Sequence, residues 1–234
     1  MKIFPALYAL LVFANVLIAK QPLAITSDSS VYKNNPNYIL ETNLYDIYKT
    51  KKADVVMLGN SLTHGVNWNE LLGRPNVVER GVPGDLTEGM LNRMNSVIKL
   101  QPKLCFILAG VNDVYYWIPV ETIFNNYVQM ISLLKSKNIT PVIQSTLYAG
   151  KEWGKDWNLK SEDNAGRNKE IEKLNRLLRE YASRNNIDYI DLVSQTTNDN
   201  FLNPEITYDG IHLNAKGFKI WGREVEKILR KYGL

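Results

Sequence analysis

Short apolar segments alternate with longer amphipathic segments along most of this chain. The short segments are rich in Val, Ile and Leu, and they span Ala53–Leu58, Asn76–Glu79, Lys103–Leu108, Ile139–Leu147 and Ile187–Leu192. The longer segments repeat apolar residues at helical spacing and span 37–50, 87–99, 120–137, 165–185 and 214–232. Because strands that are apolar throughout are buried on both faces, this alternation predicts an α/β fold with a parallel sheet between two layers of helices.

The composition is that of a globular protein without a nucleic-acid partner. Hydrophobic residues make up 45% of the 234 residues and charged residues 22%, which is ordinary for a folded domain. The net charge is +4, and the 28 basic residues are interspersed among 24 acidic ones. Nucleic-acid binding would need a concentrated basic stripe, so no such partner is expected.

The N-terminus differs from the rest of the chain. Met1 and Lys2 precede an almost wholly apolar run over 3–19, and Lys20 ends it. This pattern predicts a signal peptide within residues 1–24, and therefore a periplasmic or secreted protein. The alternative is an uncleaved anchor, in which case residues 3–19 are the expected membrane contact. Residues 25–52 are interpreted as a linker and an N-terminal helix, and 53–234 as the main domain.

Polar and glycine-rich residues follow four of the predicted strands. These segments are 59–61, 81–85, 110–113 and 148–164. In open α/β sheets, ligands bind outside the carboxyl ends of the strands. We therefore expect these four segments to meet at one edge of the sheet.

A serine in the first of these loops and a histidine just before the last predicted helix could form a nucleophile and its base. Ser61 follows Gly59 after the first predicted strand, and His212, one of two histidines, precedes the last predicted helix. Asp209 lies three residues before His212, close enough to orient the imidazole and stabilise its protonated form. The alternatives are that Ser61 only caps a helix and that His212 lies in an ordinary surface loop with Asn214 as the helix cap.

Two further residues could stabilise an oxyanion. Gly84 lies in a glycine-rich turn, where a backbone N–H can closely approach a ligand. Asn112 follows the third predicted strand, where its amide could point to the same place. The alternative for Asn112 is a simple turn residue.

Four motifs together resemble those of the SGNH hydrolases, also called GDSL-type esterases or lipases. The motifs are G-N-S-L-T at 59–63, G-V-P-G-D-L-T at 81–87, G-V-N-D at 110–113 and D-G-I-H at 209–212. The resemblance covers about residues 53–230 and implies a flavodoxin-like three-layer α/β/α fold with a five-stranded parallel sheet. It also implies a serine ester hydrolase that needs no metal or organic cofactor.

The same resemblance implies roles for individual residues. Ser61 would be the nucleophile, His212 the base and Asp209 the third member of a catalytic triad. The oxyanion hole would consist of the Ser61 and Gly84 N–H groups and the Asn112 side chain. Asn60 departs from the family pattern, which usually has Asp before the serine, and this departure puts fine positioning in doubt rather than the reaction class.

Other polar residues near these motifs have simpler interpretations. His64 is expected at the edge of a pocket, Asp113 to support its loop, and Asp85 to bond the backbone of its turn. Arg93 is expected to be an exposed or packing side chain on the following helix.

Aromatic residues in two of the loops bear on the substrate. Tyr115 and Trp117 follow Asn112, while Trp153 and Trp157 lie in the long segment 148–164. Exposed aromatic rings can stack on sugars or line an acyl groove, and they can also simply pin a loop. The sequence favours an exported esterase that removes short acyl groups, such as O-acetyl, from a carbohydrate or similar small ester. A lysophospholipase or thioesterase with the same site, and a noncatalytic glycan-binding module, are the alternatives.

Overall fold

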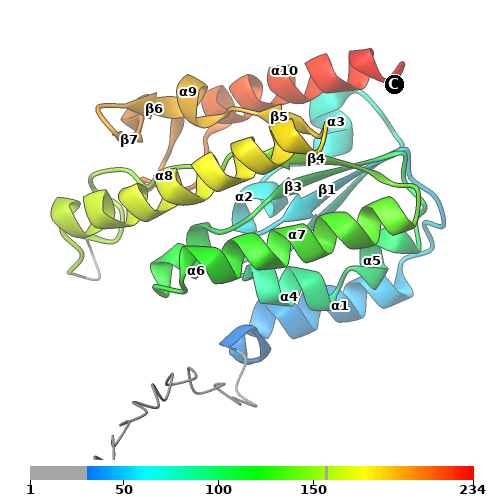
Figure 1. Cartoon of the computed structure of the whole chain (residues 1–234), viewed down its shortest axis with the longest axis horizontal. Helices are drawn as coiled ribbons and strands as arrows, with labels where there is room; N and C mark the ends of the chain where they lie inside the picture. The colour runs from blue at the N-terminus through cyan, green and yellow to red at the C-terminus, as the bar shows by residue number, and fades with distance from the viewer. Residues whose placement is uncertain (1–30, 156–157) are drawn as a thin grey trace, which may run out of the picture.

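A five-stranded parallel sheet organises the chain. The computed structural model describes residues 31–155 and 158–234 (Figure 1). The strand order is β2-β1-β3-β4-β5, with every neighbouring pair parallel. The strands are β1 Val55–Gly59, β2 Val77–Gly81, β3 Leu104–Leu108, β4 Thr140–Gln144 and β5 Asp188–Ile190. This order is that of flavodoxin-like folds, so the predicted fold class is confirmed.

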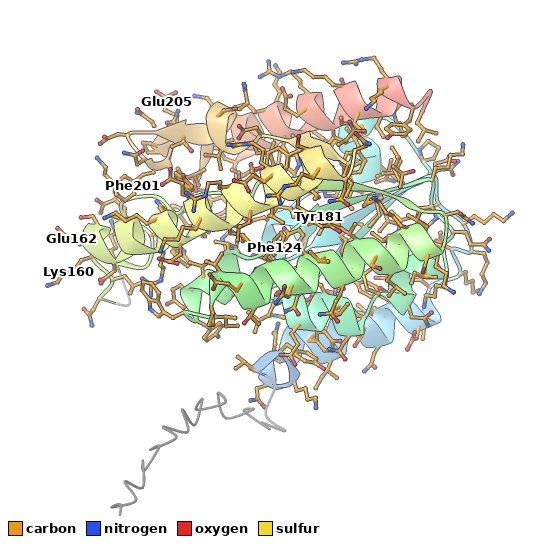
Figure 2. All side chains as sticks on the ribbon, viewed as in Figure 1. Phe124, Lys160, Glu162, Tyr181, Phe201 and Glu205 are labelled. Atoms are coloured by element: carbon orange, nitrogen blue, oxygen red, sulfur yellow. The ribbon has the colours of Figure 1, made fainter. Side chains whose placement is uncertain are left out.

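Helices cover the sheet on both sides (Figure 1). On one side, α10 (Ala215–Lys231) contacts the short α3 (Trp68–Leu72). On the other side, α7 (Val120–Ser136) contacts both α4 (Thr87–Asn92) and α8 (Ser161–Arg184). Figure 2 shows Phe124 of α7 and Tyr181 of α8, whose rings meet edge to face at 5.7 Å.

The core explains why the strands are apolar throughout. All five residues of β1 and of β3 are buried, as expected for strands with helices on both faces. Cys105, the single cysteine of the chain, lies within β3 and is fully buried.

The predicted helix over 87–99 is instead two short helices. α4 ends at Asn92, and α5 spans Asn95–Ile98. Between them the backbone tightens, because the N–H of Met94 bonds Leu91 and that of Ser96 bonds Arg93, three residues back in each case. Arg93, the residue that ends α4, is buried in the interior of the protein.

The N-terminal helix packs beside the sheet edge that carries the glycine-rich loops. α1 (Pro36–Ile47) begins at Asn35, whose side chain caps it, and a 3₁₀ turn, η1 (Val31–Asn34), precedes it. The hydroxyl of Tyr45 donates to the carbonyl of Gly81 at 2.7 Å. The predicted signal peptide over 1–24 lies outside the described residues. In the part that is described, no helix has the length and apolarity needed to span a membrane.

The remaining elements are short and close to the carboxyl edge of the sheet. They are α2 (Ser61–His64), α6 (Val111–Tyr115), α9 (Val193–Thr196) and the 3₁₀ turn η3 (Pro204–Ile206). β6 (Thr197–Asn198) and β7 (Phe201–Leu202) form an antiparallel hairpin that the sequence patterns do not predict. Strands of two residues are too short to show the alternation of apolar and polar residues that marks a strand.

Candidate active site

Ser61, His212 and Asp209 form a continuous hydrogen-bonded chain. The Oγ of Ser61 lies 2.9 Å from Nε2 of His212. Nδ1 of the same imidazole lies 2.6 Å from Oδ2 of Asp209. A hydroxyl, an imidazole and a carboxylate in this order are the groups needed to activate a serine nucleophile.

The local backbone explains how these three side chains meet. Ser61 is the first residue of α2, directly after β1, so its hydroxyl lies at the carboxyl edge of the sheet. His212 is held in a turn, where Thr207 donates its hydroxyl to the His212 carbonyl at 2.6 Å. Gly210 adopts a φ of +90°, which a side chain would strain, and this lets the turn fold tightly before α10. Asn214 caps α10 by accepting the N–H of Lys216 at 2.9 Å.

Asp209 is held as a carboxylate by its neighbours. Burial acts to raise its pKa, but hydrogen bonds from the His212 ring and from the N–H groups of Ile211 and His212 outweigh that effect. The pKa of Asp209 is therefore below its ordinary value. Because it stays ionised, it can orient the imidazole and stabilise the imidazolium.

Asn60 supports the start of α2. Its side-chain oxygen accepts the N–H of Leu62 at 3.0 Å and so caps the helix that carries Ser61. The residue is fully buried. An uncharged amide can cap the helix without burying a charge. The helix that carries Ser61 therefore keeps its cap although Asn60 departs from the family pattern.

Gly84 and Asn112 lie in loops that contact each other. Asn112 donates one N–H of its side-chain amide to the carbonyl of Asp85 at 2.8 Å, and the amide has a second N–H. Gly84, directly before Asp85, has a φ of +75°. This conformation disfavours a side chain, and a Cβ at Gly84 would lie 3.2 Å from the side-chain nitrogen of Asn35. The two candidate oxyanion donors are thus tied together through Asp85.

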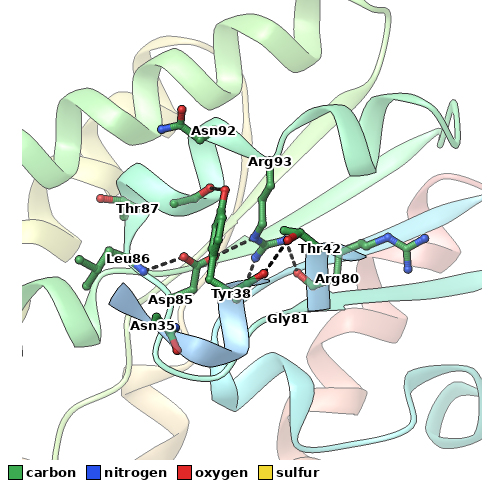
Figure 3. A network of polar contacts seen from close by, with 12 residues as sticks. Asn35, Tyr38, Thr42, Arg80, Gly81, Asp85, Leu86, Thr87, Asn92 and Arg93 are labelled. Atoms are coloured by element: carbon green, nitrogen blue, oxygen red, sulfur yellow. Dashed lines mark hydrogen bonds and ion pairs between the residues drawn. The ribbon is translucent and has the colours of Figure 1, made fainter. Parts of the chain in front are cut away.

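Arg93 connects several segments of this region. The sequence predicts an exposed or packing side chain; the residue is 4% exposed, so it packs in the interior, and it also makes three polar contacts (Figure 3). It donates to the carboxylate of Asp85 at 2.7 Å, to the carbonyl of Arg80 at 3.0 Å and to that of Gly59 at 2.8 Å. Arg93 therefore connects the ends of β1 and β2 to the loop that contains Gly84.

Two buried carboxyl groups lie within this network. Burial raises the pKa of Asp85 to about 6, and the guanidinium of Arg93 limits that rise, so Asp85 is ionised at neutral pH. Burial also raises the pKa of Glu79 to about 7, although Glu79 accepts the N–H of Gly81. Asp113 supports its loop as expected, because its Oδ1 accepts the backbone N–H of Thr87 at 3.0 Å.

Two cavities border the Ser61–His212–Asp209 chain. The smaller one holds about 190 Å³ and is lined by Ser61, Leu62, His64, Gly65, Tyr208, His212, Leu213 and Phe218. His64 thus lines a pocket edge as expected, with its Nε2 3.4 Å from a carboxylate oxygen of Glu41 on α1. The larger cavity has a volume of about 720 Å³, and Asp209 is one of the residues that line it.

The four aromatic candidates have different surroundings. Trp153 lines the larger cavity and packs edge to face on Tyr115 at 5.0 Å. Tyr115 and Trp117 line neither of these two cavities. The guanidinium carbon of Arg167 lies over both rings, 4.7 Å from the centroid of Tyr115 and 5.1 Å from that of Trp117. Trp157 lies outside the described residues.

Tyr208 is a site residue that the sequence analysis missed. Its ring stacks on the His212 imidazole with 5.8 Å between centroids and 16° between planes. It lines both cavities and is 71% exposed. Its position one residue before Asp209 is the only sequence signal that could have drawn attention to it.

A metal site is not evident in the described part of the chain. Over residues 31–155 and 158–234, no group of three or more His, Cys, Asp or Glu side chains is placed to hold a metal ion.

Comparison with known proteins identifies the family. Residues 57–220 match the model of the GDSL-like lipase/acylhydrolase family. The chain belongs to this family. The match spans β1 to α10 and includes all the residues of the candidate site, from Ser61 to His212. The matched region is therefore an acylhydrolase domain of the GDSL-like type.

Similar proteins include two whose names agree with this family and one that is named as a cytidylyltransferase. A GDSL-like lipase from Bacteroides thetaiotaomicron has a similar structure, with a TM-score of 0.71 and 26% identity over 84% of this chain and 98% of that one. The isoamyl acetate-hydrolyzing esterase of Saccharomyces cerevisiae is 25% identical over 70% of this chain and 73% of its own length. The N-acylneuraminate cytidylyltransferase of Streptococcus agalactiae is 26% identical over 79% of this chain, but this chain spans only 40% of that enzyme.

Proposed function

We propose that this GDSL hydrolase removes short acyl groups, O-acetyl above all, from a carbohydrate or similar small ester through an acyl-enzyme. The observation that carries the proposal is the unbroken hydrogen-bonded chain from Ser61 through His212 to Asp209. In this proposal Ser61 is the nucleophile, His212 the general base and Asp209 the carboxylate that orients it.

The proposed reaction has two halves. Ser61 Oγ attacks the ester carbonyl carbon while Nε2 of His212 takes the hydroxyl proton, and Asp209 stabilises the imidazolium. His212 then gives that proton to the departing alcohol oxygen, which leaves an acyl-Ser61. Water attacks this acyl group with His212 again as base, releasing the acid and restoring the hydroxyl.

The proposed oxyanion hole consists of the Ser61 and Gly84 N–H groups and the Asn112 side chain. The positive φ of Gly84 and the second N–H of the Asn112 amide support this assignment. The bond from Asn112 to the Asp85 carbonyl fixes the amide before substrate arrives. Such preorganised donors stabilise negative charge without reorganisation during the reaction.

The size of the cavity at Ser61 supports a short acyl group. At about 190 Å³, it is below the range of about 300–1,000 Å³ that is usual for ligand pockets. Its apolar walls include Leu62, Leu213 and Phe218, which suit a methyl or ethyl group rather than a long chain. The yeast relative is named for hydrolysis of isoamyl acetate, whose acyl group is equally short.

The test is a chain-length series of p-nitrophenyl esters with a nucleophile control. We expect kcat/KM to be highest for acetate and to fall steadily from butyrate to octanoate and palmitate, and Ser61→Ala to abolish turnover of all four esters. A preference for palmitate would favour a lysophospholipase or thioesterase. Equal hydrolysis by Ser61→Ala and the unchanged protein would instead favour a noncatalytic glycan-binding module.

Export by residues 1–24 is part of the proposal. Its support is the apolar run over 3–19 that follows Lys2. We expect residues 1–30 to carry a fused reporter enzyme out of the cytoplasm, and the mass of the mature protein to show cleavage near residue 19. An exported but uncleaved product would indicate a membrane anchor, and a reporter retained in the cytoplasm would contradict export.

A further inference from the structure

The cavity of about 720 Å³ beside Asp209 has no role in the reaction as described so far. Its lining includes residues of the β6–β7 hairpin, whose place in the fold can be followed in Figure 1. Its walls come from the loop 150–155, the hairpin and the segment 204–210. Its volume lies within the range of about 300–1,000 Å³ that is typical of small-molecule sites.

The cavity lies on the side from which an alcohol would leave. His212 must donate a proton to the departing oxygen, so the alcohol portion of the substrate has to lie next to the imidazole. Tyr208 stacks on that imidazole and lines both the small cavity at Ser61 and the large one. The two cavities are therefore neighbouring parts of the same region, separated by the Tyr208 side chain.

The lining of the large cavity combines aromatic faces with hydrogen-bonding groups of both kinds. Phe201 (Figure 2), Trp153 and Tyr208 supply rings. Lys151 supplies a donor and Asp199 an acceptor, and these two groups lie 2.7 Å apart. The Lys151 ammonium also lies 5.2 Å from the centre of the Phe201 ring, so these three residues form one cluster.

A neutral sugar matches this chemistry. Its hydroxyl groups both donate and accept hydrogen bonds, and the C–H face of its ring packs on aromatic side chains. The lining carries two lysines, Lys151 and Lys155, against three carboxylates, Glu152, Asp199 and Asp209, so an anionic alcohol would gain little there. A long acyl chain would have to bury these charged groups, which costs free energy.

We infer that this cavity binds the sugar portion of the ester, with Lys151, Asp199 and Phe201 as its principal contacts. The inference rests on the proposed esterase function and specifies the alcohol that it releases. The acyl group then lies at Ser61, and the sugar extends past Tyr208.

A comparison of two acetate esters tests the inference in the full-length protein. Partially O-acetylated xylo-oligosaccharides offer several hydroxyl groups to the polar side chains of the cavity, whereas the nitrophenyl group of p-nitrophenyl acetate offers none. We expect Lys151→Ala and Phe201→Leu to lower kcat/KM for the sugar ester by about tenfold, mainly through KM, and to change that for p-nitrophenyl acetate by less than about twofold. Phe201→Leu keeps an apolar side chain in the hairpin while removing the aromatic face.

Matched controls separate this effect from a general loss of surface charge or aromatic area. Lys173 forms an exposed ion pair with Glu170 at 2.6 Å on α8, outside the cavity lining, so Lys173→Ala should leave both rates unchanged. Tyr116→Ala removes an exposed ring elsewhere and should do the same. Equal losses on both esters, or no loss on the sugar ester, would overturn the inference.

A binding measurement keeps the test independent of catalysis. Ser61→Ala protein should bind xylotetraose in calorimetry, and adding Lys151→Ala should weaken the Kd by at least about fivefold. Absence of xylotetraose binding, or an unchanged Kd, would overturn the sugar site even if p-nitrophenyl acetate is hydrolysed. Loss of Ser61-dependent hydrolysis with intact xylotetraose binding would instead overturn the esterase function and leave a sugar site.

Discussion

Arg93 and Asp85 form an ion pair at 2.7 Å in which both side chains are almost wholly buried, at 2% and 0% exposure. A buried pair of this kind contributes little net free energy, because desolvation offsets much of the attraction. Its effect here is geometric, since the Arg93 guanidinium also bonds the carbonyls of Gly59 and Arg80. The pair holds the loop with Gly84 in register with the strand that leads to Ser61.

Removing the guanidinium should disturb both stability and turnover. Arg93→Met leaves Asp85 buried without its partner, so we expect the free energy of unfolding to fall by about 3–5 kcal/mol in urea titrations. Arg93→Lys keeps a charge but loses the planar group that reaches three acceptors. We expect it to fold and to lower kcat for p-nitrophenyl acetate by about tenfold or more, with little change in KM. An unchanged kcat in folded Arg93→Lys would contradict a positioning role.

Asn112 should contribute to turnover rather than to binding. Asn112→Ala removes one proposed oxyanion donor and should lower kcat for p-nitrophenyl acetate by about 10²–10³. Asn112→Asp, a substitution of similar size, should be no better, because it replaces the donor with a negative charge. If kcat fell by less than about threefold in either variant, Asn112 would not be part of the oxyanion hole. Circular dichroism of both variants checks that the loop change has not unfolded the protein.

Glu79 should make the stability of the protein depend on pH. Its pKa is raised from 4.5 to about 7 in the folded protein, chiefly by burial, so the folded state holds the proton more tightly than the unfolded state. This contribution is therefore fully present below the unfolded pKa and is lost as pH rises through about 7. At about 1.4 kcal/mol per pKa unit, the loss over this shift is at most about 3.5 kcal/mol.

Glu79→Gln is the matched variant for this effect. It keeps an oxygen that can accept the N–H of Gly81 but cannot ionise. In urea titrations from pH 5 to 8, its free energy of unfolding should decline less than that of the unchanged protein. Parallel pH profiles for the two proteins would show that Glu79 does not cause the decline.

Tyr208 should affect how well His212 is oriented. The stacked aromatic contact is worth about 0.5–1.5 kcal/mol, so Tyr208→Ala should lower kcat/KM for p-nitrophenyl acetate by about two- to tenfold. Tyr208→Phe keeps the ring and should retain the full rate. Because the side chain is exposed, the melting temperature should be unchanged in both variants. Equal rates for Tyr208→Ala and Tyr208→Phe would show that the stacking is unimportant.

The sequence predicted the parts of the molecule that follow from regular patterns. Continuous apolar runs predicted the strands, and strands of a parallel sheet bring their carboxyl ends together. This reasoning predicts that the loops with Ser61, Gly84 and Asn112 share one edge of the sheet. The resemblance to the SGNH hydrolases predicts that His212, 151 residues from Ser61, joins them, and the two side chains lie within hydrogen-bond distance. The contact between Asp209 and His212 follows from their short spacing in a turn.

The features that the sequence did not predict depend on tertiary contacts. Arg93 lies at helical spacing from Met90 and Val97 on the apolar side of the predicted helix, but periodicity alone does not show which polar groups a buried arginine bonds. Tyr208 lies in an irregular turn, where no pattern fixes the direction of a side chain. The β6–β7 hairpin, which forms a wall of the larger cavity, is too short to be recognised.

The burial of Cys105 makes this chain well suited to labelling experiments. As the only cysteine, it lies fully inside β3, and burial raises the pKa of its thiol well above the usual value. Since the thiolate is the reactive form, maleimide reagents should leave Cys105 unmodified. A cysteine introduced at position 151 or 208 would then carry a single fluorophore, and its emission could report directly when a sugar enters the cavity beside Asp209.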